Sequence, residues 1–131
     1  MCPSQKKCAG IIAPCANGFV LEEHLKEIAH HIPEGRHAVV IMDRAGWHLT
    51  QQIKIPVNIS ILHLPPYSPE LNPQENVWQY LKDTFLSNRV FDSVDDITAA
   101  CVEAWNAFAN SPDLIASIAT RDWADLSVTY L

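Results

Sequence analysis

The fold of this chain is decided by two short apolar runs, HAVVIMD (residues 37–43) and NISILHL (residues 58–64). Their length and their content of Val and Ile are typical of buried strands, and near-continuous apolar strands are typical of parallel sheets. The segment between the runs is too long for a tight hairpin and suits a crossover connection. The sequence therefore predicts two parallel strands, with Asp43 at the end of the first.

Helical signals lie on both sides of these strands. Residues 20–32 (VLEEHLKEIAHHI) repeat apolar side chains at helical spacing, and Pro33 stops that helix. After the stiff PPYSP loop, Asn72 is predicted as an N-cap, Pro73 as the first helical residue and Glu75 as the third. The expected apolar face of this second helix is Val77, Trp78, Leu81 and Phe85.

The rest of the chain adds weaker elements. Residues 8–15 (CAGIIAPC) are expected to form a third strand near an edge, and residues 49–55 a short helix. Ser93 is expected to open a helix, and a short helix is expected over residues 113–119. The apolar face of the Ser93 helix is Ile97, Ala100, Cys101, Ala104, Trp105 and Phe108. The fold class is an α/β layered domain around a short sheet.

Composition limits the function. With 131 residues and 48% hydrophobic residues, the chain is expected to be one globular domain. It has no apolar run of membrane-span length and no signal peptide, so we expect a cytoplasmic protein whose four cysteines are reduced. The net charge of −6 argues against a free-standing DNA binder, which is normally basic. Any DNA-related function therefore needs a separate DNA-binding segment.

Two acids are the strongest candidates for chemistry. Asp43 ends a predicted strand, and Glu75 lies in the first turn of the helix that follows the next strand. Sites in open α/β sheets form outside the carboxyl ends of the parallel strands, where both acids are expected. Carboxylates at such an edge suit Mg²⁺ or Mn²⁺, which can support phosphoryl transfer.

Structural explanations compete with this one. Glu75 three residues after Asn72 fits a capping box, and an Asp after a strand is a common turn former. Asp43, His48, His63 and Glu75 could also bind zinc, and Cys2, Cys8 and Cys15 match no usual zinc spacing. Trp47 and Trp78 could stack on bases, although core packing is commoner for Trp at helical spacing.

The blocks VVIMDRAGWH (residues 39–48) and LPPYSPELNPQENVWQYLK (residues 64–82) together resemble the DDE superfamily of mariner-like bacterial insertion-sequence transposases. The resemblance implies an RNase H-like, three-layer fold with a short mixed sheet flanked by helices. It also implies two Asp and one Glu that bind two magnesium ions for DNA strand cleavage, strand transfer and integration. Asp43 would be the second Asp and Glu75 the Glu. His48, Asn72, Pro73 and Trp78 match supporting positions of the pattern.

The first Asp of that pattern has no counterpart, because no acid lies between Met1 and Leu21, and Glu22, Glu23 and Glu27 fall on a predicted helix. The family's N-terminal helix-turn-helix is absent as well. We therefore expect a transposase catalytic-domain fragment that lacks its first strand and is inactive alone. It would need DNA and an upstream half of the transposase as partners.

Two alternatives stay open. One is a non-catalytic remnant that self-associates, for example as a strand-swapped homodimer, through exposed sheet edges. The other is a small metal-dependent nuclease that recruits Asp92 or Asp95 as a further acid.

Overall fold

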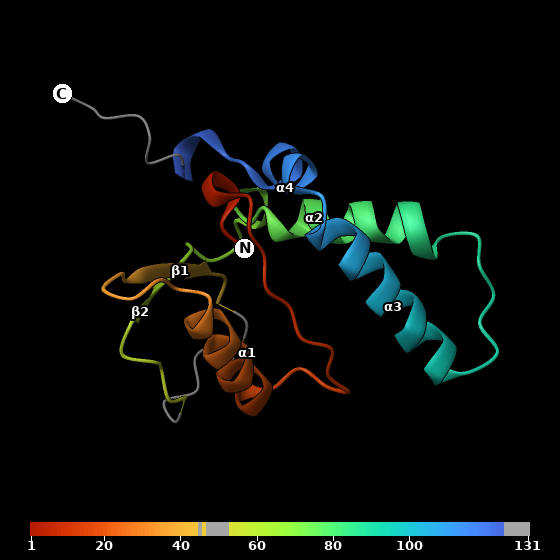
Figure 1. Cartoon of the computed structure of the whole chain (residues 1–131), viewed down its shortest axis with the longest axis horizontal. Coiled ribbons are helices and arrows are strands. Elements are labelled where there is room, and N and C mark those ends of the chain that lie inside the picture. The colour runs from red at the N-terminus through yellow and green to blue at the C-terminus, as the bar shows by residue number, and fades with distance from the viewer. Residues whose placement is uncertain (45, 47–52, 125–131) are drawn as a thin grey trace. The chain divides into compact units, whose positions relative to one another are not determined.

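A computed structural model describes residues 1–44, 46 and 53–124 of the chain (Figure 1). The chain divides into two compact units. We call Ala9–Asn72 the sheet unit, and Met1–Cys8 together with Pro73–Leu131 the helical unit. Each unit is described by itself.

The sheet unit is built on the predicted pair of strands. β1 (Ala38–Met42) pairs in parallel with β2 (Ile59–His63), in a register that runs from Ala38 opposite Ile59 to Met42 opposite His63. The parallel pairing predicted from the length of the connection is confirmed. Both strands therefore end at the same edge, and Asp43 is the first residue beyond β1.

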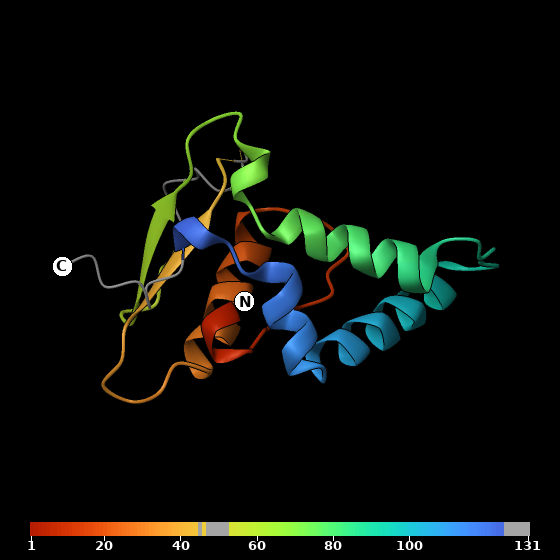
Figure 2. The same ribbon diagram turned by 90° about the horizontal axis from the view of Figure 1, so that it is seen from above.

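Helix α1 (Gly18–His30) lies beside the two strands, as Figures 1 and 2 show. Its predicted range of 20–32 is displaced by two residues at each end, the usual uncertainty of helix ends. Asn17 caps it, because its side chain accepts a hydrogen bond of 2.9 Å from the Val20 backbone N–H. Leu21 and Leu25 of α1 are buried in one core with Ile59 of β2.

Only one face of the sheet is covered by the described residues. Val40, Met42 and Ile61 pack against the core that α1 completes. The alternate side chains face outward and are exposed: Val39 to 62%, Ile41 to 39% and Leu62 to 54%. The expectation that the first strand is buried is therefore wrong for the described residues, because β1 alternates between half-buried and exposed side chains. Apolar composition shows that a strand prefers burial, but not which segment covers it.

Two other predictions from the sequence change. Residues 8–15 form no strand, and residues 11–15 are exposed one after another, without the alternation of a paired strand. Pro14 lacks a backbone N–H, which weakens strand pairing further. Within the described residues the sheet has two parallel strands, so it is neither three-stranded nor mixed. The helix predicted over residues 49–55 falls mostly outside the described residues, and residues 53–55 are not helical.

The helical unit contains the remaining helices. α2 (Gln74–Leu81) continues into a π-helical turn, η4 (Lys82–Leu86), and a loop then leads to α3 (Val94–Ala109), which runs back as in Figure 2. α4 (Pro112–Ala119) follows, and the short turn η1 (Pro3–Gln5) contacts it. Together these helices enclose one core, made of the buried residues Val77, Leu81, Ala104, Phe108, Ile115 and Ala119.

Aromatic rings complete this core. The ring of Phe108 is fully buried and lies 6.1 Å from the ring of Tyr80 and 5.9 Å from the ring of Trp105, measured between centroids. The predicted apolar face of α3 is confirmed for Ala100, Ala104 and Phe108, and Ile97 departs from it with 43% exposure. The Ser93 cap is confirmed by a hydrogen bond of 3.1 Å from the Asp96 N–H.

The cysteines Cys2, Cys8, Cys15 and Cys101 are all described, and each is a free thiol in the structure. Among the described residues, every helix is too short or too polar to cross a lipid bilayer.

Phe108→Ala should lower the free energy of unfolding by about 3–5 kcal/mol, because it leaves a cavity at the centre of the helical core. Chemical denaturation followed by circular dichroism measures the change. Val102→Ala is the matched control on the same helix, since Val102 is 43% exposed, and should cost less than about 1 kcal/mol. Equal losses in the two variants would contradict this assignment of the core.

Candidate functional site

Asp43 lies at the carboxyl edge of the parallel sheet, where the sequence placed it. Asp43 is half-buried, and two contacts from the end of β2 hold the backbone on either side of it. The Leu64 backbone N–H donates to the Met42 carbonyl oxygen at 2.8 Å. Nδ1 of His63 lies 3.3 Å from the carbonyl oxygen of Asp43. The backbone of Asp43 is therefore restrained at the end of the strand.

Glu75 lies in the first turn of α2, as predicted, and is exposed. The described helix begins at Gln74, one residue later than expected, which is within the usual uncertainty of helix ends. The capping-box explanation of Glu75 depends on the backbone N–H of Asn72, not on Pro73, and stays a prediction. Pro73 already has helical φ and ψ angles, of −64° and −15°.

The two acids belong to different units, Asp43 to the sheet unit and Glu75 to the helical unit. Within the described residues, no group of three or more His, Cys, Asp and Glu side chains is arranged to hold a metal ion. The zinc set considered from the sequence includes His48, which lies outside the described residues, so that set stays a prediction. Carboxylate oxygens are the donors that Mg²⁺ and Mn²⁺ prefer, so the donor chemistry of Asp43 and Glu75 fits either ion.

The supporting residues are divided between described and undescribed parts of the chain. His48 and Trp47 lie outside the described residues. Asn72 and Pro73 are half-buried just before α2. Trp78 is 56% exposed, so its predicted place on the apolar face of α2 is wrong, whereas Val77 and Leu81 are buried as expected.

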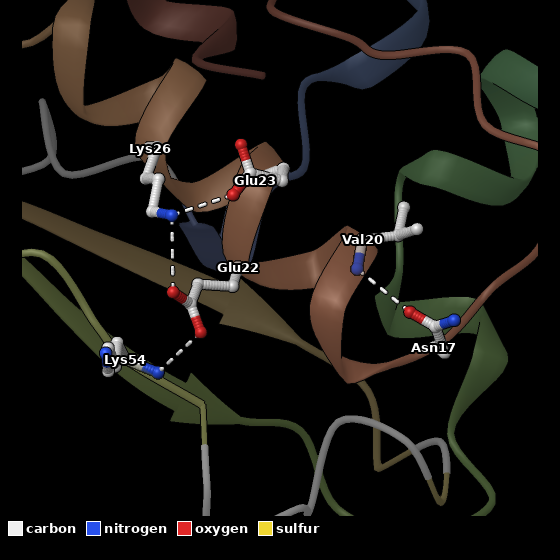
Figure 3. A network of polar contacts seen from close by, with 6 residues as sticks. All are labelled: Asn17, Val20, Glu22, Glu23, Lys26 and Lys54. Carbon is white, nitrogen blue, oxygen red and sulfur yellow. Dashed lines mark hydrogen bonds and ion pairs between the residues drawn. The ribbon is translucent and has the colours of Figure 1, made fainter.

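The acids of α1 are engaged in contacts within the sheet unit (Figure 3). Oε2 of Glu22 accepts a hydrogen bond of 3.3 Å from the Lys54 backbone N–H, and Oε1 of Glu22 lies 3.3 Å from Nζ of Lys26. Oε1 of Glu23 lies 2.7 Å from the same Nζ. The Lys54 bond ties α1 to the segment before β2, and the Lys26 contacts lie within α1, so Glu22 and Glu23 have a structural role.

His63 is the residue whose contact sequence reasoning missed. The sequence suggested either a packed core His or a zinc ligand, whereas its ring meets the backbone of Asp43. The signal that could have found it is the strand register, because pairing the two apolar runs end to end places His63 opposite Met42.

Comparison with known proteins gives two matches. Residues 1–98 match the family described as DDE superfamily endonuclease. The uncharacterized protein y4pE/y4sA of Sinorhizobium fredii is 48% identical to the chain over 127 residues, which covers 97% of this chain and 94% of that protein. No solved structure matches the chain significantly.

Glu22→Gln should lower Tm by about 1–3 °C at neutral pH, the scale of a surface charge contact. The Lys54 N–H bond, helped by Lys26, lowers the pKa of Glu22 below its ordinary value of 4.5. A carboxyl with a lowered folded-state pKa stabilises the protein above its unfolded-state pKa, and this stabilisation disappears as the pH falls through the folded-state pKa. The difference in Tm between the natural chain and Glu22→Gln should therefore vanish once the pH falls below the folded-state pKa of Glu22.

Thermal melts of both proteins from neutral to acidic pH measure this difference. Glu34→Gln, which changes an exposed acid of the same unit, serves as the control and should leave Tm unchanged. A Tm difference that grows on acidification would contradict the role given to Glu22.

Proposed function

Because the chain belongs to the DDE superfamily endonuclease family, we propose that it supplies Asp43 and Glu75 to a metal-dependent site for DNA strand cleavage and strand transfer. The observation that carries this proposal is the place of Asp43, directly after β1 at the carboxyl edge of a parallel sheet. In this proposal the domain is RNase H-like, the group is mariner-like, and the DNA substrates are the ends of an insertion sequence and its target.

The cofactor in this proposal is Mg²⁺ or Mn²⁺. Asp43 and Glu75 would hold it, and its chemistry would be to activate a water or hydroxyl and to stabilise the leaving oxygen. The contribution of the protein is to fix the direction of each carboxylate. The strand end does so for Asp43, and the start of α2, directly after Pro73, does so for Glu75.

We further propose that the chain is inactive alone, because it lacks a first Asp. The described strands, β1 and β2, contain no acid. Glu22 and Glu23 on α1 both form ion pairs with Lys26. An upstream half of the transposase would then supply the missing acid. The net charge of −6 also supports a need for a partner, since the contacts to DNA phosphates would come mainly from a basic segment of that partner.

A self-associating, non-catalytic module is the second candidate function, and the exposed sheet face favours it. Val39, Ile41 and Leu62 form one apolar surface on the outer side of β1 and β2. A parallel sheet is normally covered on both faces, and a second copy of this chain offers a surface of matching chemistry.

Mn²⁺ binding tests the catalytic proposal. The natural chain should bind Mn²⁺ in calorimetry, and Asp43→Asn or Glu75→Gln should weaken that binding by about tenfold or more, because each removes a charged ligand. Asp92→Asn and Asp95→Asn are controls among the exposed acids, and they should leave binding unchanged. Binding that both ligand substitutions leave unaltered would refute the site. A loss confined to the controls would favour the nuclease that recruits Asp92 or Asp95.

Plasmid nicking with Mn²⁺ separates an active enzyme from an incomplete one. The chain alone should not nick plasmid DNA, because two acids cannot position the metal for an in-line reaction. If the natural chain nicks plasmid DNA and Asp43→Asn does not, the chain holds a complete catalytic site, and the proposal that it is inactive alone is wrong.

Light scattering tests self-association. If the sheet face binds a second copy, the natural chain is a dimer and Leu62→Glu converts it to a monomer, because a charge then lies in the apolar contact. Val90→Glu places the same charge in the helical unit, on a residue that is 95% exposed, and should leave the mass unchanged. A monomeric natural chain would exclude the dimer.

A further inference from the structure

Two peptide groups flank the Cα atom of Asp43, and consecutive residues at the end of β2 hold both of them. Leu64 donates its backbone N–H to the Met42 carbonyl, in the peptide before Asp43, at 2.8 Å. The His63 ring reaches the Asp43 carbonyl, in the peptide after it, at 3.3 Å. The first contact continues the parallel ladder beyond its last pair, whereas the second is made by a side chain.

We infer that His63 is a positioning residue for the Asp43 carboxylate and acts through the Asp43 backbone. A carbonyl oxygen only accepts hydrogen bonds, so Nδ1 of His63 carries the proton and donates. With both flanking peptide planes held, φ and ψ at Asp43 are restrained, and these angles set where its Cβ points and limit which χ1 rotamers its carboxylate can adopt. Metal ligands must be held to within about 0.5 Å, so this restraint bears directly on metal affinity.

The alternation of side chains along the strands favours this role over direct metal ligation by His63. On β2, Ile59 and Ile61 face the core with α1, and Leu62 faces outward. His63 therefore continues the inner face, opposite Met42. Asp43 is the first residue beyond β1, and continuing the alternation to it would turn its side chain to the other face of the sheet. The contact that His63 makes with Asp43 is with its carbonyl oxygen.

The same sheet offers a matched control. His37 precedes β1 at the opposite end of the strands, and its Nε2 lies 2.9 Å from Oγ of Ser60. It is also a His that makes a hydrogen bond between the two strand segments, but it contacts no backbone atom of Asp43. The Mn²⁺ affinity of His37→Leu therefore shows how much the loss of any His hydrogen bond between the strands affects binding.

The inference rests on the proposed function, and the full chain tests it with His63→Leu, His63→Asn and His37→Leu in Mn²⁺ calorimetry at slightly alkaline pH. Leu removes the donor, and we expect it to weaken Mn²⁺ binding by about tenfold, as for other groups that orient a metal ligand. Asn places an amide N–H where Nδ1 stood but has no atom at Nε2, so it should retain binding within about twofold. His37→Leu should have no effect.

A second measurement does not need metal. Nitrogen NMR of the imidazole should show the Nδ1–H tautomer for His63 in the natural chain, and also in Asp43→Asn, which keeps the carbonyl. Circular dichroism melts establish that each variant is folded. If His63→Leu proves unfolded, the tautomer of His63 in the natural chain and the Mn²⁺ affinity of His63→Asn test the positioning role instead.

The possible results separate the two proposals. Equal losses in His63→Asn and His63→Leu would overturn the positioning role and point to Nε2 as the important atom. Unchanged binding in His63→Leu, or an Nε2–H tautomer, would overturn the role while leaving the metal site standing. A natural chain that binds no Mn²⁺, or an Asp43→Asn variant that binds it equally well, would overturn the proposed function together with this inference.

Discussion

The parallel pairing of β1 with β2 is the constraint on which the sheet unit depends. Parallel strands end at one edge, so the pairing alone brings Asp43, His63 and the start of the PPYSP loop to the same side of the unit. It also requires a connection that leaves the sheet and returns. Helix α1 then stabilises the pair by burying Leu21 and Leu25 against Ile59. Neither strand would be stable in water without that cover.

Sequence reasoning succeeded where one local rule was sufficient. Apolar runs of strand length marked both strands, Ser93 marked the start of α3, and the short helix expected over residues 113–119 is α4. It failed where pairing decided the outcome. Residues 8–15 are as apolar as a strand, yet no strand among the described residues pairs with them. Trp78 has the spacing of a core residue, but Val77 and Leu81 already fill the position that faces α3 and α4.

The same contrast holds for the candidate site. Asp43 and Glu75 could be assigned from the motif blocks, because both stand at the termini of elements that the sequence marks clearly. The contact of His63 with the Asp43 backbone could not be assigned, because it depends on the register between segments far apart in the chain. The acids of α1 also needed the structure, since only there does Glu22 meet the Lys54 backbone. A formal charge therefore says little about which acids are available for chemistry.

The π-helical turn at Lys82–Leu86 sets how the apolar face continues past α2. A π turn takes more residues per revolution than an α turn, so each of its residues rotates the chain less about the axis. The apolar stripe of Val77 and Leu81 would drift sideways in a continuous α-helix, and the wider turn returns Phe85 toward it, where its ring meets Tyr80 at 6.2 Å. In a regular α-helix the same face is reached three residues after Leu81, whereas Phe85 follows Leu81 by four residues. The π turn therefore accommodates one extra residue while Phe85 keeps its place on the apolar face.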